Sequence, residues 1–212
     1  MTTRLPLHQD LYLLAHDQSG KPLIHQSSMA LGLAGAALLD LALDGRVAVA
    51  RGRVAVSGRP APTGDAVADH LLAFVASAPG DVRVPIRKAA ADACVRTREA
   101  LIAAGVLVRV TKRVMGVVPT TRYVAADIAS VVRASSGARS AVEGWKEPDT
   151  RCAALCGLVG VLRLEGELYL DQPPGELVTR LREIAGSGSR EVAELVSVVD
   201  TLVTEAAIAV YR

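Results

Sequence analysis

The residue types that carry out catalysis occur in this sequence without forming a known constellation. The histidines lack metal-ligand spacing, and the one close cysteine pair has no second pair or histidine nearby to complete a zinc site. There is no phosphate-binding loop ending in Lys-Ser/Thr and no Gly-x-Ser-x-Gly nucleophile elbow. We therefore predict no catalytic residue, no metal and no cofactor, and we expect that the protein is not an enzyme. The residues considered are His8, His16, His25, His70, Cys94, Cys152 and Cys156.

Positive charge is the stronger chemical signal, and it gathers in the middle of the chain. Between Arg83 and Arg113 there are eight lysines and arginines against two acids, whereas the whole chain carries a net charge of only +2. The remainder is therefore net negative. A basic segment on a mildly acidic body predicts a surface that meets an anionic partner, either nucleic acid or membrane. An ordinary solvated helix face is the competing interpretation of the same excess.

Composition narrows these classes. Half of the 212 residues are apolar, but there is one Phe, one Trp and four Tyr, so an aliphatic core is expected. So few aromatic rings exclude recognition of single strands by base stacking. The longest apolar stretch, Met29–Leu43, is shorter than the ~20 residues of a membrane span and contains Asp40. The absence of a signal-peptide pattern and of a disulfide framework predicts a cytoplasmic protein. The heavy use of Ala, Val and Arg is typical of a GC-rich bacterial source.

Hydrophobic periodicity and turn signals predict a mainly α fold: a single helical domain over residues 1–212 with two β-hairpins, one of them near Val106–Val118. The first hairpin is predicted over Arg46–Ser57. In the second, Val106–Thr111 and Val114–Val118 are expected as strands joined at Lys112-Arg113. Small residues in the second helix predict that a neighbouring element approaches it closely. The expected helices are Leu5–Leu14, Ser27–Leu43, Ala66–Ala76, Ile86–Ala104, Ala126–Arg133, Arg151–Leu162, Glu176–Ile184 and Arg190–Val210.

Five segments, taken in order, resemble the Golgi phosphoprotein family over nearly the whole chain. Eukaryotic members of that family are peripheral membrane proteins that recognise phosphatidylinositol 4-phosphate and adapt glycosyltransferases to the Golgi. The resemblance implies a mainly helical fold whose β-hairpin presses on the membrane, anionic membrane lipid as partner, protein clients, and contacts between copies. The segments are Leu5–Leu14, Gly32–Gly35 running into Leu39–Arg46, Ala61–Asp65, Arg98–Leu107 and Asp149–Arg151.

The resemblance also implies where lipid would bind. In the eukaryotic proteins a Trp and three Arg form the phosphoinositide pocket, and the corresponding positions here are His25, Ala34, Ala91 and Cys94. Arg87 and Arg98 fall on the same helical stripe as the last two, one turn away on either side. We therefore hypothesise a displaced head-group site formed by Arg87, Arg98 and His25, with a membrane-facing hairpin at Lys112, Arg113, Val114 and Met115.

Two other functions remain open at this stage. A helix followed by a basic hairpin is also the arrangement of a winged-helix DNA-binding regulator. The predicted helix has no Asn or Gln to read bases, and the low overall charge argues against nucleic acid. The other alternative is a protein-interaction scaffold without a lipid ligand, which would show itself as an oligomer or through a co-purifying partner.

Overall fold

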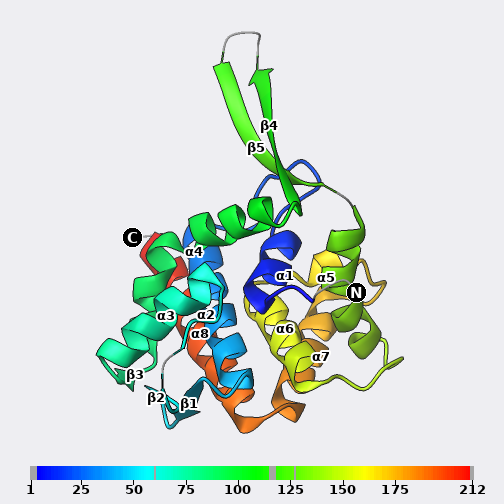
Figure 1. The fold of residues 1–212 in the computed structure, drawn as a ribbon. Helices are drawn as coiled ribbons and strands as arrows, with labels where there is room; N and C mark the ends of the chain where they lie inside the picture. The colour runs from blue at the N-terminus through cyan, green and yellow to red at the C-terminus, as the bar shows by residue number, and fades with distance from the viewer. Residues whose placement is uncertain (1–3, 60, 115–117, 127, 211–212) are drawn as a thin grey trace.

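The computed structural model describes residues 4–59, 61–114, 118–126 and 128–210, and these form a helical body with two small antiparallel sheets (Figure 1). The predicted mainly α class is confirmed. In chain order the described elements are α1 (Leu7–Leu14), α2 (Gln26–Leu43), β1 (Val47–Ala50), β2 (Arg53–Val56), α3 (Ala66–Ser77), β3 (Gly80–Asp81), α4 (Arg83–Ala103), β4 (Leu107–Val114), β5 (Val118–Ala125), α5 (Ile128–Val142), α6 (Thr150–Val161), the 3-10 turn η1 (Glu165–Leu168), α7 (Pro174–Ser187) and α8 (Arg190–Val210).

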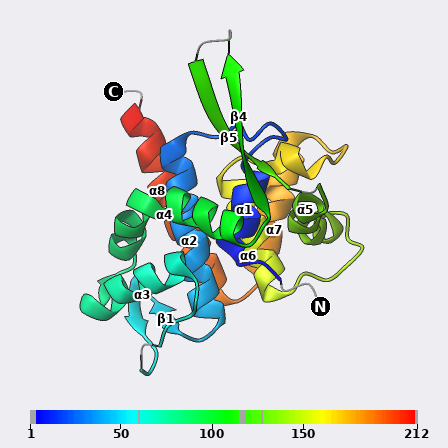
Figure 2. The same cartoon turned by 45° about the horizontal axis from the view of Figure 1, so that its top comes forward.

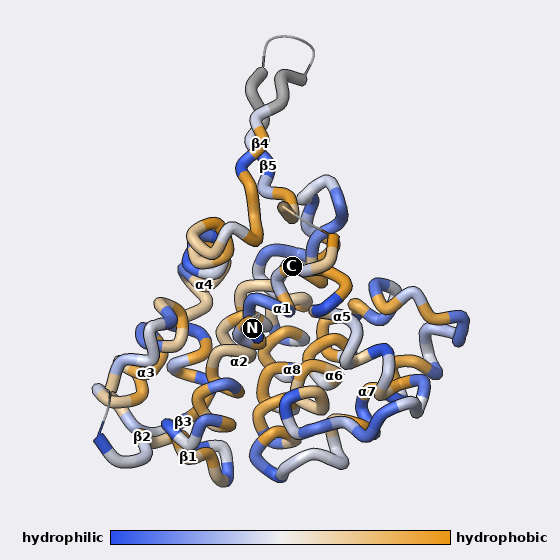
Figure 3. Tube along the Cα trace, turned by 45° about the vertical axis from the view of Figure 1, so that its right-hand side comes forward, coloured by the Kyte–Doolittle hydropathy of each residue, from blue (hydrophilic) through white to orange (hydrophobic). Residues whose placement is uncertain are grey.

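Helix α2 is the centre of the body, with α1, α3, α4, α6 and α8 packed around it. Its residues 32–39 are all buried. By length and composition alone α2 could cross a membrane, but here it is a core helix surrounded by other helices. Figure 3 shows apolar colour concentrated on α2, α6 and α8, with polar colour in the outer loops.

Glycines let α8 and the end of α6 approach closely, as the sequence predicts for α2. A Cβ atom added to Gly35 would lie 2.3 Å from Val199 Cγ2 of α8, and one added to Gly32 would lie 2.7 Å from Leu162 Cδ1. In α6, a Cβ atom at Gly157 would lie 2.8 Å from Val196 Cγ2. Helix α8 therefore rests on glycines of two different helices.

The first hairpin is confirmed, with Val47 opposite Val56 and Ala50 opposite Arg53. Its turn residues Arg51 and Gly52 both have positive φ, at 52° and 72°, as a two-residue hairpin turn requires. The sequence did not predict β3, which pairs Gly80 with Val54. Two residues carry no periodicity, so this strand leaves no readable pattern.

The second hairpin is longer than predicted, and its strand boundaries need correction. Lys112 and Arg113 do not join the strands: they belong to β4, opposite Thr120 and Pro119 of β5. Pro119 suggested that the strand stops at Val118, but a two-stranded ribbon leaves each strand an unpaired edge that tolerates proline. The β-branched and aromatic residues 120–124 then extend the pairing to Ala125.

Helix α5 also runs further than predicted, to Val142 instead of Arg133. The serines expected to loosen the chain are accommodated within the helix. The Ser135 and Ser136 hydroxyls donate to the carbonyl oxygens of Val132 and Arg133, at 3.1 and 3.0 Å. Ala134, Ala138 and Ala141 are buried on the other side of this helix, so packing outweighs local preference.

We predict that Gly35→Ala lowers the free energy of unfolding, by about 1–3 kcal/mol, because its new methyl group overlaps the stiff Val199 side chain. Urea unfolding followed by circular dichroism measures this. Gly186→Ala in α7 is the matched control, since a Cβ there meets nothing within 4 Å and a gain of about 0.5–1 kcal/mol is expected. Equal stability changes in both variants would contradict the close packing of α2 on α8.

Candidate functional site

The cations of α4 already have partners within the protein. One face of the helix is apolar and fully buried, through Ile86, Ala93 and Leu101. The charged residues on its other faces form these contacts: Arg83 with Asp81 at 2.8 Å, Arg87 with Glu205 at 2.6 Å, Arg96 with Asp92 at 2.6 Å, Lys88 over the ring of Phe74 and Arg98 over the ring of Tyr123. The local excess of positive charge is therefore smaller in the fold than in the sequence.

Arg87 and Arg98 serve different parts of the molecule. Arg87 reaches across to Glu205 of α8, and both side chains are about half exposed. The Arg98 guanidinium lies 4.4 Å from the ring centre of Tyr123 in β5. Eleven residues of helix separate the two by about 16 Å along its axis. In these conformations they define two ends of a surface instead of one closed pocket.

Arg98 sits within a group of rings beneath the β4–β5 hairpin. The rings of Tyr12 and His16 stack with their centroids 4.1 Å apart. Burial raises the pKa of Tyr12 to about 12, with the positive charge of Arg98 opposing the rise. Burial also lowers the pKa of His16, so this imidazole is held neutral near pH 7. Arg98 thus connects α4 to α1 and to the hairpin.

His25 is exposed and acts as the N-cap of α2. Its Nδ1 accepts the Ser27 backbone N–H at 3.3 Å and lies 2.8 Å from Ser27 Oγ. Of the other positions that correspond to the family pocket, Ala34 is fully buried and Ala91 is exposed. Cys94 is half-buried, and burial raises the pKa of its thiol. None of these side chains supplies a positive charge comparable to an arginine.

The β4–β5 hairpin projects from the body beside the end of α4 (Figure 2). Lys112, Arg113 and Val114 are its strand residues in β4, opposite Thr120, Pro119 and Val118, while Met115 lies outside the described residues. From Leu107 to Ala125 the sequence has four cations and no acid. The cations are Arg109, Lys112, Arg113 and Arg122. This ribbon is therefore the most uniformly positive element of the chain.

A short turn before α2 holds the base of the hairpin. The Arg122 guanidinium donates to Ser19 Oγ at 2.8 Å. Gly20, with φ of 73°, passes so close that a Cβ atom there would lie 2.1 Å from the carbonyl oxygen of Tyr123. Leu107 is buried at the start of β4. These contacts fix the direction in which the hairpin leaves the body.

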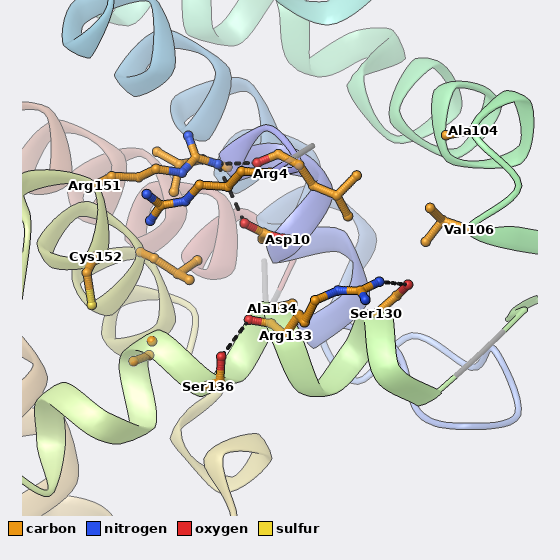
Figure 4. Close-up of a pocket in the computed structure, with 15 residues that line it drawn as sticks. Arg4, Asp10, Ala104, Val106, Ser130, Arg133, Ala134, Ser136, Arg151 and Cys152 are labelled. Atoms are coloured by element: carbon orange, nitrogen blue, oxygen red, sulfur yellow. Dashed lines mark hydrogen bonds and ion pairs between the residues drawn. The ribbon is translucent and has the colours of Figure 1, made fainter. Parts of the chain in front are cut away.

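A second polar cluster, which the sequence analysis did not identify, centres on Arg151 at the start of α6. Its guanidinium forms ion pairs with Asp40 of α2 and, at 3.5 Å, with Asp10 of α1, and it also donates to the Leu5 carbonyl oxygen (Figure 4). Asp40 accepts the Leu7 N–H at 2.6 Å at the start of α1. Nearby, the fully buried His8 places Nε2 3.2 Å from Asp65 Oδ2. Only coordinates bring these separated residues together.

Burial decides the protonation chemistry of this cluster. It raises the pKa of Asp10 to about 6 and also raises the pKa of Asp40, and the positive charge of Arg151 only partly offsets both shifts. Burial acts in the same direction on Asp65. There the hydrogen bond and charge of His8, together with the N–H groups of α3, outweigh burial, so the pKa of Asp65 is lowered. No group of three His, Cys, Asp or Glu side chains in the described part of the chain is arranged to hold a metal ion.

The fold and this site define a helical domain with one projecting basic ribbon. The family model for Golgi phosphoprotein 3 (GPP34) matches residues 7–205, which is nearly the whole chain. The protein therefore belongs to the Golgi phosphoprotein 3 family, as its sequence segments suggest. No curated protein matches the chain.

The raised pKa of Asp10 predicts how stability depends on pH. Because the folded state holds a proton on Asp10 up to about pH 6, whereas the unfolded state releases it near 3.8, folding gains stability as pH falls through 6. Relative to Asp10→Asn, the wild-type protein should gain about 1 kcal/mol between pH 8 and pH 5. Urea unfolding of both proteins across this range measures the difference.

Comparison with Asp10→Asn cancels the opposing contribution of His16, whose lowered pKa removes stability as pH falls below 6.5. A difference between the two proteins that is constant from pH 8 to pH 5 would show that Asp10 is ionised throughout.

Proposed function

We propose that the protein is a non-enzymatic peripheral membrane protein that docks reversibly on anionic lipid head groups through its β4–β5 hairpin. The observation that carries this is the run of four cations without an acid over a ribbon that stands out from the body. Eight residues of strand at about 3.4 Å each give the ribbon a reach of roughly 27 Å. That length lets basic side chains meet a membrane surface while the body stays in water.

Family membership supports the same function in its broader outline. We infer an adaptor that binds lipid on the cytoplasmic face of the membrane and presents its body to protein clients. Because His25, Ala34, Ala91 and Cys94 stand at the pocket positions, we propose attraction to anionic head groups generally instead of selection of phosphatidylinositol 4-phosphate. Charge attraction to a head-group surface needs no closed pocket.

The contribution of α4 to such docking follows from magnitudes. Arg87 must leave Glu205 to meet lipid, and an exposed ion pair of this kind is worth about 0–1 kcal/mol. A cation at an anionic membrane gains about 1 kcal/mol. The two nearly cancel, so Arg87 adds little net affinity. The hairpin cations are the principal contributors in this proposal.

Reversing two hairpin charges tests the proposal. In a sedimentation assay with phosphatidylserine vesicles at low salt, Lys112→Glu with Arg113→Glu should weaken partitioning at least roughly thirtyfold, since each cation contributes about 1 kcal/mol. Arg180→Glu with Arg182→Glu on α7 makes the same change in net charge away from the hairpin and should retain most of the binding. Raising the ionic strength to about 0.15 M should weaken wild-type binding.

Failure of the wild-type protein to sediment with any anionic vesicle at low salt would disprove membrane docking. Duplex DNA in a gel shift, and light scattering of the purified protein, then separate the two alternatives. A DNA complex lost in the hairpin variant would indicate a nucleic-acid-binding regulator. A stable oligomer without either ligand would indicate a scaffold.

A further inference from the structure

A cavity of about 530 Å³ lies between α1, α5 and α6, with the end of α4 at its edge (Figure 4). Its walls are mainly aliphatic, from Leu5, Leu7, Val106, Ala134 and Leu155. Its size falls within the roughly 300–1,000 Å³ of typical small-molecule sites. It is separate from the projecting strands of the hairpin, and neither the family match nor the docking proposal gives it a role.

The charged side chains of the cavity are three arginines against one aspartate. Arg151 is engaged by Asp10 and Asp40, and the exposed Arg4 pairs with Asp149 at 3.4 Å. Arg133 of α5 differs from both. It donates to Ser130 Oγ at 2.8 Å, and among the described residues no carboxylate lies within 4 Å of it. Figure 4 shows Arg133 and Ser130 together at one side of the cavity and the Arg151 cluster at another.

We propose that this cavity binds a single-chain anionic amphiphile, with its acidic head group at Arg133 and its tail along the aliphatic walls. A guanidinium whose described partner is a neutral hydroxyl gains a stronger, charge-assisted hydrogen bond when a carboxylate or phosphate arrives. The apolar walls favour a hydrocarbon chain, because burying it removes apolar surface from water on both sides. Neither feature alone selects this ligand, but together they match an anionic head joined to a tail.

Isothermal titration calorimetry on the full chain tests this with four probes, each kept below the concentration at which it self-associates. Decanoate and decyl phosphate should bind saturably at one site, and the tighter of the two identifies the head group. Acetate has the charge without the tail, and decanol has the tail without the charge. Both should bind at least tenfold more weakly than the better anionic probe.

Two variants locate the site. Arg133→Gln should weaken binding of the better anionic probe at least tenfold. Gly137→Leu should block the cavity, because Gly137 lines it and a Cβ there meets only Cys152 Sγ, at an ordinary 3.8 Å. Leucine also favours the helix over glycine, so this variant is expected to fold. Arg139→Gln, on the same helix but not lining the cavity, is the matched control and should bind within twofold of wild type.

Equal affinity for decanol and decanoate would overturn the proposal, since it would leave a purely apolar cavity. Unchanged affinity in both Arg133→Gln and Gly137→Leu would overturn it as well, by placing the probe elsewhere. Absence of saturable binding by either anionic probe would have the same consequence. These outcomes are independent of vesicle sedimentation, which depends on the hairpin.

Discussion

The ion pair between Arg151 and Asp40 is the interaction on which the arrangement of the helices depends. Through it α6 is tied to α2, and the same guanidinium holds Asp10 of α1 and the Leu5 carbonyl oxygen. Asp40 in turn accepts the first N–H of α1. Both side chains are mostly buried, so removing one partner would strand the other charge away from water, at a cost of about 3–5 kcal/mol. Since α1 contacts α2, α4, α5 and α6, this link also sets the floor on which the hairpin base rests.

The same cluster explains what the family resemblance measures. Segments Leu5–Leu14, Leu39–Arg46, Ala61–Asp65 and Asp149–Arg151 are far apart in sequence, yet they meet around Arg151 and the neighbouring His8–Asp65 contact. Their polar residues cap helices or neutralise one another: Asp65 caps α3 and Asp149 caps α6. These segments therefore hold the fold together, and family membership follows from them. Lipid recognition depends on other residues, at the hairpin and along α4, where this chain departs from the eukaryotic pattern.

How far the sequence could predict the structure depended on whether a signal was local. Periodicity located the helices, and the Arg51-Gly52 turn located the first hairpin, because both are short-range patterns. The small residues of α2 indicated close packing, although only coordinates identify Val199 and Leu162 as the neighbours. The candidate site was less predictable. Glu205 lies 118 positions from Arg87, and Tyr123 meets Arg98 only through the register of β5, so a count of charges along α4 could not detect either partner. The extent of the second hairpin was hidden by Pro119, and that of α5 by its serines.

These partners divide the positive charge of the protein into two kinds. Cations on α4 stabilise the body: Arg87 joins α4 to α8, and Arg98 joins α4 to α1 and β5. An anionic surface would have to compete with those contacts, so α4 is suited to positioning the hairpin and only weakly to binding. The hairpin has no acid of its own between Leu107 and Ala125, and its base is fixed by Gly20 and by the hydrogen bond from Arg122 to Ser19. A ribbon held in one direction loses little conformational freedom when it meets a flat surface, which favours docking by a few cations. The charges with the fewest internal partners thus belong to the element that reaches furthest from the core.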